Sequence, residues 1–207
     1  MCATYHVGMT AHATVDARAA QKSDTRARLL DAARRLFGRL GPALTTVDQI
    51  AREAGTSRAN FYLHFGGKED VLHALRREMW RMALGFYEAF AELPDTSQAT
   101  LHRWLQGVAE VWTRDGGLTR IVLGATPGEV EQEYQEHVTQ YIDALTRDAG
   151  KWRGFSKVQA RQRAYLLIVQ LERCMNDQDH IDLPVERTSL LRTLAAVWAA
   201  TLTAPHR

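Results

Sequence analysis

Hydrophobic residues recur three and four positions apart through most of the chain, which is the spacing of one face of an α-helix. The first such run begins at Asp24 and continues to Leu40, and Gly41 and Pro42 then predict the end of the helix. The apolar positions of this run are Leu29, Leu30, Ala33, Leu36, Phe37 and Leu40. Residues 1–23 lack the spacing, so we predict a flexible arm there.

Two short helices are predicted after this first one. Thr46 suits the N-cap of one helix, whose apolar face consists of Val47, Ile50, Ala51 and Ala54. Gly55 can adopt the left-handed conformation that a tight turn requires, and Ser57 suits the N-cap of the next helix, which ends near His64. This pattern is typical of a helix-turn-helix, whose second helix enters the major groove of DNA. A structural hairpin within a helical bundle would have the same pattern.

Helical spacing continues through the rest of the chain. We predict a long helix from about Lys68 toward Pro94, and further helices over residues 97–114, 118–124, 128–149, 157–176 and 185–202. No segment shows the strict alternation of a half-buried strand. The sequence therefore predicts an all-α protein of about nine helices, organised as an arm (1–23), a helix-turn-helix domain (24–70) and a larger helical domain (71–207).

The charge distribution separates the two ends of the chain. Residues 1–77 contain 12 Lys and Arg against 7 Asp and Glu, a balance of +5, whereas the remaining 14 against 17 give −3. The N-terminal part is thus the one that could meet a polyanion such as DNA, although a solvated basic surface would look the same. Cys2 and Cys174 are far apart, and no long apolar segment is present, so we expect a cytoplasmic protein without disulfides.

The segment from Arg28 to Leu75 resembles the N-terminal DNA-binding domain of TetR-family transcriptional repressors. The resemblance rests on a dense set of matches, namely Ala32-Ala33, Leu36-Phe37, Gly41, Thr45-Thr46-Val47, Ile50-Ala51, Ala54-Gly55, Ser57, Phe61-Tyr62, His64-Phe65, Lys68-Glu69 and Leu72. It implies a dimeric regulator that binds a palindromic operator in double-stranded DNA. Thr56 stands where the family usually has Val or Ile, which predicts a weaker apolar contact in the turn.

The resemblance and the side-chain chemistry together imply roles in DNA binding. Thr45 and Thr46, at a helix start, and Lys68 would hold phosphates. Arg58 matches the guanine acceptors O6 and N7, and Asn60 matches N6 and N7 of adenine. The other expected contacts are Ser57, Ala59, Tyr62 and His64. Arg58 and His64 could instead be solvated surface residues.

TetR-like proteins carry a C-terminal domain that binds a small ligand, and the resemblance implies the same here. Residues 112–142 and 171–202 also look similar to EthR-like repressors, which implies an apolar tunnel. Large aromatic faces with a few polar groups suit an apolar or aromatic ligand, although they are equally typical of a plain core. The expected ligand-binding residues are Trp104, Val108, Trp112, Ile121, Tyr134, Tyr141, Glu172 and Trp198.

Glu172 is the most informative of these residues, because it lies within the apolar run 166–175. A carboxylate in such a run needs a partner or a ligand group. Arg163 or Arg173 on the same helix could equally satisfy it.

A second interpretation of the C-terminal domain is a metal-dependent enzyme. Glu129, Glu133 and either Glu136 or His137 share a helical face and could ligate a metal ion. The Glu-x-x-His spacing of di-iron sites is absent, and Asp177 with His180 is predicted to lie in a loop, so we interpret the face as solvated and acidic. No nucleophile or phosphate-binding motif is found, and we expect no catalysis, metal or cofactor.

The last two predicted helices have wider apolar faces than one side of a core helix requires. We therefore expect them to form a four-helix homodimer interface, which the family also uses. The apolar positions are Tyr165, Leu166, Ile168, Val169, Leu190, Leu191, Leu194, Val197 and Trp198.

Overall fold

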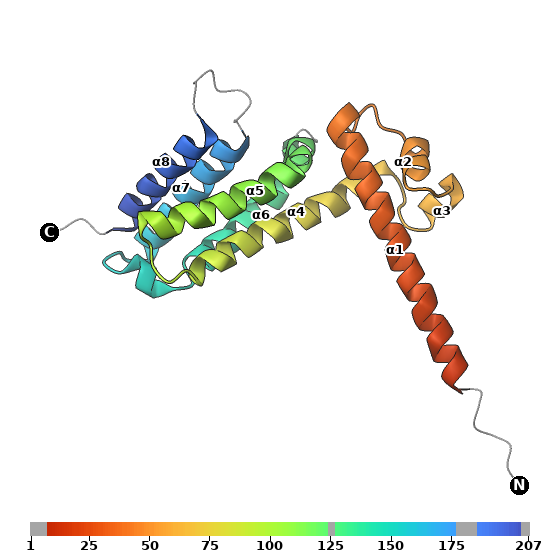
Figure 1. The fold of residues 1–207 in the computed structure, drawn as a ribbon, viewed down its shortest axis with the longest axis horizontal. Coiled ribbons are helices and arrows are strands. Elements are labelled where there is room, and N and C mark those ends of the chain that lie inside the picture. The colour runs from red at the N-terminus through yellow and green to blue at the C-terminus, as the bar shows by residue number, and fades with distance from the viewer. Residues whose placement is uncertain (1–7, 124–126, 177–185, 204–207) are drawn as a thin grey trace, which may run out of the picture. The chain divides into compact units, whose positions relative to one another are not determined.

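The structure is a computed structural model that describes residues 8–123, 127–176 and 186–203, with side chains described over 20–113, 133–175 and 186–203. Every element within these ranges is helical, as predicted (Figure 1). The elements are α1 (Gly8–Leu40), α2 (Val47–Glu53), α3 (Arg58–Tyr62), α4 (Lys68–Ala91), α5 (Gln98–Leu123), α6 (Pro127–Leu145), η1 (Ala149–Trp152), α7 (Lys157–Asn176) and α8 (Arg187–Leu202). None of the described helices is long and apolar enough to span a membrane.

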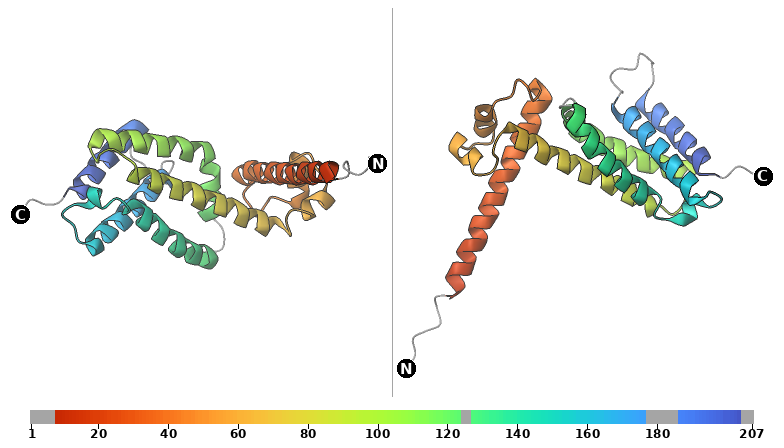
Figure 2. Two further views of the ribbon diagram at one scale, coloured as in Figure 1. Left: turned by 90° about the horizontal axis from the view of Figure 1, so that it is seen from below. Right: turned by 180° about the vertical axis from the view of Figure 1, so that it is seen from behind.

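The chain divides into two compact units, Met1–Arg76 and Arg77–Arg207. In the first unit α2 packs against α1 and α3 packs against α2 (Figure 2). Its core is built from most of the apolar positions that the helical spacing predicted, which include Leu29, Leu30, Ala33, Leu36, Phe37, Ile50, Ala51, Phe61 and Phe65. Two predicted positions differ, because Leu40 is exposed and Val47 is half-buried. Burial of these side chains against each other supplies the main stabilisation of α1, α2 and α3. Two of these helices, α2 and α3, are too short to persist alone.

The first helix is longer than predicted. We expected it to begin at Asp24, which is wrong, because α1 begins at Gly8. The sequence between these positions lacks an apolar stripe but contains Ala11, Ala13, Ala17, Ala19 and Ala20, and Ala has the highest helix propensity. Hydrophobic periodicity indicates a helix only where the sequence has an apolar stripe, so it did not predict this part of α1.

In the second unit α5 packs along α8 and α6 packs along α7, with further contacts of α7 to α5 and α8. Figures 1 and 2 both show α7 and α8 side by side. The core contains the largest buried side chains of the unit, including Phe90, Leu101, Leu105, Tyr141, Leu145 and Trp198.

Two helix boundaries in this unit differ from the prediction. The expected break between residues 114 and 118 is absent, and α5 runs continuously to Leu123, because Gly in a helix costs about 1 kcal/mol relative to Ala but does not forbid it. The helix expected to end at Ala149 ends at Leu145, and η1 follows it. Trp152 of η1 is buried and donates from Nε1 to the Leu145 carbonyl at 3.0 Å, which closes the helix end.

The turn between α2 and α3 depends on backbone conformation. Gly55 has φ of +66°, and the next residue, Thr56, donates its N–H to the Ala51 carbonyl at 2.9 Å. A side chain at Gly55 would meet no neighbour within 4 Å, so only the left-handed conformation restricts this position.

We expect Gly55→Ala to lower the free energy of unfolding of the N-terminal unit by about 1–2 kcal/mol, because alanine is strained at positive φ. Gly85→Ala is the matched control, since Gly85 lies within α4, also has open space around it and has no positive φ. That substitution should stabilise its helix by about 0.5–1 kcal/mol. Thermal unfolding followed by circular dichroism should show shifts of opposite sign, and shifts of the same sign would contradict the turn geometry.

Candidate functional sites

The start of each helix in the helix-turn-helix is capped by the side chain that the sequence indicated. Thr46 accepts from the Gln49 N–H at 3.2 Å, and the Gln49 side chain accepts from the Thr46 N–H at 2.8 Å, which forms a capping box. Ser57 accepts from the Asn60 N–H at 3.1 Å. These bonds fix where α2 and α3 begin while leaving Thr46 and Ser57 exposed.

Two phenylalanines hold α3 against the rest of its unit. Phe61 and Phe65 are buried, their ring centroids are 5.8 Å apart, and the Arg26 guanidinium lies over the Phe65 ring at 4.8 Å. The two phenylalanines are four residues apart and lie on the inner side of the segment from Arg58 to Phe65. The opposite side therefore faces outward, and its exposed residues are Arg58, Ala59, Tyr62 and Leu63.

Arg58 is held across this outer side by two neighbours. Its guanidinium pairs with the Asp48 carboxylate of α2 at 2.9 Å and donates to the Tyr62 hydroxyl at 3.4 Å. It also lies over the Tyr62 ring at 5.7 Å, and the Asp48 charge is the main reason that the pKa of Arg58 is raised. The side chain is exposed and charged, and an incoming phosphate or base would compete with Asp48 for it.

Asn60 is less free than the sequence suggested. Its amide Nδ2 donates to the Thr56 hydroxyl at 2.6 Å, so a bidentate contact with adenine requires this bond to open. Thr56 was expected only to weaken an apolar contact in the turn. In the structure it orients Asn60 instead, and the signal that could have shown this is the four-residue spacing of the two polar side chains.

Two of the residues expected to hold phosphates are engaged inside the unit. Thr45 is buried and donates its hydroxyl to the Gly41 carbonyl at 2.8 Å. Lys68 donates from Nζ to the Pro42 carbonyl at 2.6 Å. Both side chains therefore brace the loop between α1 and α2, and the hydroxyl of Thr45 has no access to DNA in this arrangement.

His64 follows α3 and is partly buried. Its Nδ1 has no hydrogen-bond partner among the residues that the structure describes. Burial is the main cause of the lowered pKa of His64, with the positive charges of Lys22 and Arg26 adding to it. The imidazole is thus kept neutral beside two cations of α1, and these cations were not included in the predicted contact set.

The expected ligand-binding residues separate into two groups in the structure. The first group is core: Trp104 donates from Nε1 to the Phe86 carbonyl at 3.3 Å, and its ring packs on Trp198 at 5.2 Å. Val108 and Trp198 are buried, and Trp112 is half-buried. Ile121 lies outside the residues whose side chains are described.

The second group consists of Glu172, Tyr134 and Tyr141. Tyr134 donates its hydroxyl to Glu172 Oε2 at 2.8 Å, and the buried Tyr141 donates to the Trp80 carbonyl at 3.2 Å. We call the surrounding rings the aromatic cluster, which consists of Trp80, Tyr87, Tyr134, His137 and Tyr141. Trp80, Tyr87 and His137 were not among the residues expected to bind a small ligand, although His137 lies at helical spacing from both Tyr134 and Tyr141.

Glu172 forms no ion pair with any other described residue, so neither Arg163 nor Arg173 satisfies it. Arg163 instead donates to the Thr201 carbonyl at 2.9 Å and lies over the Phe155 ring at 4.2 Å. Burial raises the pKa of Glu172 to about 7, and the hydrogen bond from Tyr134 partly opposes that shift.

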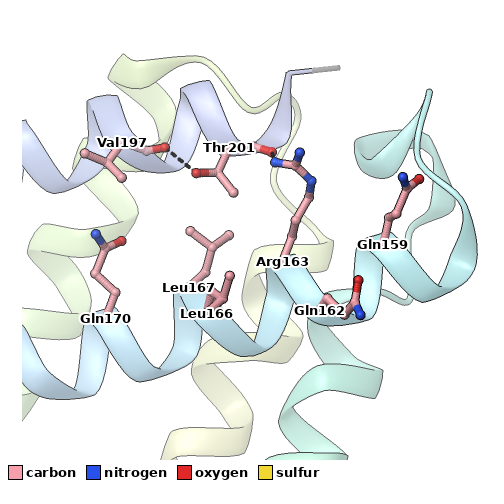
Figure 3. Close-up of a pocket in the computed structure, with 8 residues that line it drawn as sticks. All are labelled: Gln159, Gln162, Arg163, Leu166, Leu167, Gln170, Val197 and Thr201. Carbon is pink, nitrogen blue, oxygen red and sulfur yellow. Dashed lines mark hydrogen bonds between the residues drawn. The ribbon is translucent and has the colours of Figure 1, made fainter. Parts of the chain in front are cut away.

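The apolar positions of α7 and α8 have two different fates. Ile168, Leu191, Leu194 and Trp198 are buried in the unit's own core, and Leu190 is intermediate. Tyr165, Leu166, Val169 and Val197 remain exposed, and Leu166 and Val197 line a groove of about 610 Å³. Figure 3 shows this groove between the two helices, lined by Gln159, Gln162, Arg163, Leu166, Leu167, Gln170, Val197 and Thr201.

The acidic residues considered as metal ligands do not converge in the part of the chain that the structure describes, where no three His, Cys, Asp or Glu side chains could share an ion. Glu136 is exposed, and His137 is stacked on Trp80 at 5.0 Å. Glu129, Asp177 and His180 lie outside the residues whose side chains are described.

Comparison with known proteins agrees with the arrangement of the N-terminal unit. Residues 29–75 match the family of bacterial regulatory proteins of the tetR type. The transcriptional regulator SrpR of Pseudomonas putida is 47% identical over 57 residues, which are 28% of this chain and 27% of that protein. The chain thus matches about a quarter of the length of such curated relatives.

Solved structures are similar over nearly the whole chain. The fatty acid degradation regulator FadR from Bacillus halodurans has a TM-score of 0.67 at 20% identity, covering 87% of this chain and 97% of that one. FadR from Bacillus subtilis, solved in complex with stearoyl-CoA, has a TM-score of 0.66 at 18% identity and covers 84% and 97%. The chain therefore shares the all-helical fold of these solved structures, and within it residues 29–75 match the tetR family.

The pKa of Glu172 gives a pH-dependent stability. Because this pKa is about 7 in the folded chain and 4.5 for a free glutamate, the folded chain binds more protons than the unfolded chain between these values. The free energy of unfolding therefore falls as pH rises through this window. Glu172→Gln removes the dependence and keeps an acceptor for Tyr134.

We expect this variant to be more stable than the wild type at about pH 8, by on the order of 2 kcal/mol after allowance for partial exposure. The difference should shrink toward zero near the free-glutamate value. Urea unfolding at both pH values checks this, and an equal difference at both would show that Glu172 does not titrate as described.

Proposed function

We propose that the protein is a ligand-responsive transcriptional repressor. In this proposal a homodimer binds a palindromic operator and is released when a small molecule binds the C-terminal unit. The observation that carries the proposal is the outer face of α3, where capped helix starts and two buried phenylalanines leave Arg58 and Tyr62 exposed together. A recognition helix needs such a face, because bases are read from the groove by side chains that point away from the core.

The exposed residues then have distinct roles in the proposal. Arg58 reads a base edge after exchanging Asp48 for guanine, while Ala59 and Tyr62 contact the groove floor and its phosphate wall. The N-termini of α2 and α3, at Thr46 and Ser57, offer backbone N–H groups to phosphates. Asn60 reads a base only after leaving Thr56, and Lys68 acts mainly by holding the loop.

Ligand response is proposed through α4, which continues from one unit into the other. A ligand that binds better to one position of this helix would change the DNA affinity by its difference in affinity for the two states. Support comes from FadR of Bacillus subtilis, a similar fold solved with stearoyl-CoA.

Dimerisation is proposed through α7 and α8. The groove of Figure 3 has exposed apolar side chains and neutral glutamines, with no acidic residue in its lining. Self-association across a two-fold axis would bury Leu166, Val169 and Val197 against the same residues of a second copy. It would also place two recognition helices on two half-sites.

We expect Arg58→Ala to weaken binding to the selected operator about 10-fold or more and to reduce discrimination against random DNA, because a bidentate base contact contributes about 1–3 kcal/mol. Fluorescence anisotropy on fragments from the gene's own upstream region, at two salt concentrations, measures both effects.

Arg35→Ala is the matched control for this experiment. Arg35 is also exposed and also pairs with an acid of α2, Glu53 at 3.1 Å, so its removal changes the charge equally. It should alter operator affinity less than about twofold, in line with the small contribution of exposed ion pairs. Equal losses in both variants would mean that only net charge is sensed.

We expect Leu166→Glu to convert the dimer to monomer and to abolish tight operator binding, since it would place a charge in the apolar interface. Leu166 is 63% exposed in the single chain, so the fold itself should survive, as circular dichroism can verify. Val158→Glu is the control, because Val158 is 66% exposed on the same helix but does not line the groove. Sedimentation showing both variants dimeric would place the interface elsewhere.

A further inference from the structure

We propose that Glu172 and the aromatic cluster form a recognition site for an organic cation, so that the ligand class of the C-terminal unit is a positively charged apolar or aromatic molecule. The inference rests on the proposed function in so far as it names the ligand of that unit, but the site can be tested without DNA. It adds a positive charge to the apolar or aromatic ligand that the sequence suggested.

The first observation is an acid that has no counter-charge among the described residues. Glu172 lies half-buried on α7, and the Tyr134 hydroxyl is its hydrogen-bond donor. No ion pair joins it to another described residue, and Arg163 on the same helix is turned to the end of α8. A buried carboxylate must be protonated, remain charged and unpaired at a high free-energy cost, or bind a cation from outside the protein.

The second observation is the arrangement of rings around Trp80, one of which, Tyr134, bonds this acid. The Trp80 ring is 6.0 Å from Tyr134, 5.0 Å from His137 and 6.4 Å from Tyr141. Tyr87 adds a further ring, 4.8 Å from Tyr141. The faces of Trp and Tyr rings carry the negative end of the ring quadrupole, and they attract ammonium groups from which water has been removed.

The third observation is an unused donor in the same place. Trp80 Nε1 is buried and has no hydrogen-bond partner in the described part of the chain. Buried Trp N–H groups usually find an acceptor. Trp80 shares the lack of one with Trp198 of the core, but Trp80 lies in the aromatic cluster, next to the Tyr134 ring that bonds Glu172. A ligand with one cationic and one acceptor group would supply partners for both Glu172 and Trp80.

Tyr87 and Tyr141 of the cluster stay neutral under all ordinary conditions. Burial is the main cause of the raised pKa values of Tyr87 and Tyr141, and the negative charge of Glu172 raises both further. They therefore present rings and hydroxyl groups without competing negative charge. Glu172 is then the one acid of the site to which a ligand cation can pair, and the rings decide which shapes of cation fit.

Calorimetric titration with a pair of isosteres tests the proposal. Phenyltrimethylammonium and tert-butylbenzene have the same shape and differ in charge alone. At about pH 8 we expect the cation to bind the wild-type chain about 10-fold or more tightly than its neutral isostere. Glu172→Gln should remove that preference without weakening the neutral compound.

Glu136→Gln is the matched control, because Glu136 is an exposed glutamate of α6 outside the cluster. It should retain the full preference for the cation. The proposal is overturned if neither compound binds, if the two bind equally well, or if Glu172→Gln keeps the preference. Circular dichroism of each variant excludes loss of fold as the cause.

The outcomes separate this proposal from the proposed function. If the cation binds through Glu172 but leaves operator affinity unchanged, the ligand class stands and the switch fails. If the chain shows selective operator binding and no charge preference, the regulator stands and the cation site fails.

Discussion

The burial of Phe61 and Phe65 is the constraint on which the proposed DNA-reading surface depends. A five-residue helix has too few hydrogen bonds to persist alone, so its position is determined by what its inner side contacts. Two rings four residues apart fix both the position and the rotation of α3, and rotation decides which side chains face outward. Arg58 and Tyr62 are exposed together because the phenylalanines between and after them are not.

The helices of the C-terminal unit are also positioned by the burial of apolar side chains. Its helices bury one apolar side in the unit's core and leave part of another side uncovered on α7 and α8. Exposed leucine and valine side chains beside neutral glutamines are characteristic of a surface that binds another apolar surface. The division of these residues into core and surface follows from how the helices pack, since both sets have the same spacing along the chain.

Glu172 shows how a half-buried carboxylate without an ion-pair partner among the described residues can indicate a function. Its burial opposes stability at neutral pH, and no arginine of its own helix relieves it. A protein that needs only a folded core can place leucine there. An acid among tyrosine and tryptophan rings is expected where a ligand completes the site. A protein that buries such a carboxylate gains specificity for a ligand that can pair with it.

The sequence by itself determined the helical class, the capped helix-turn-helix and most core positions of the N-terminal unit, because these depend on spacing and on local bonds within a few residues. It did not determine the beginning of α1, where propensity acts without periodicity, or the continuity of α5 through its glycines. Only the tertiary structure decided that Thr45 and Lys68 brace a loop, that Asn60 bonds Thr56, and that Trp80 and His137 join Tyr134 near Glu172. The physical reason is that hydrogen bonds and burial of these side chains depend on packing between segments, and a pattern along one chain carries no information about which faces meet.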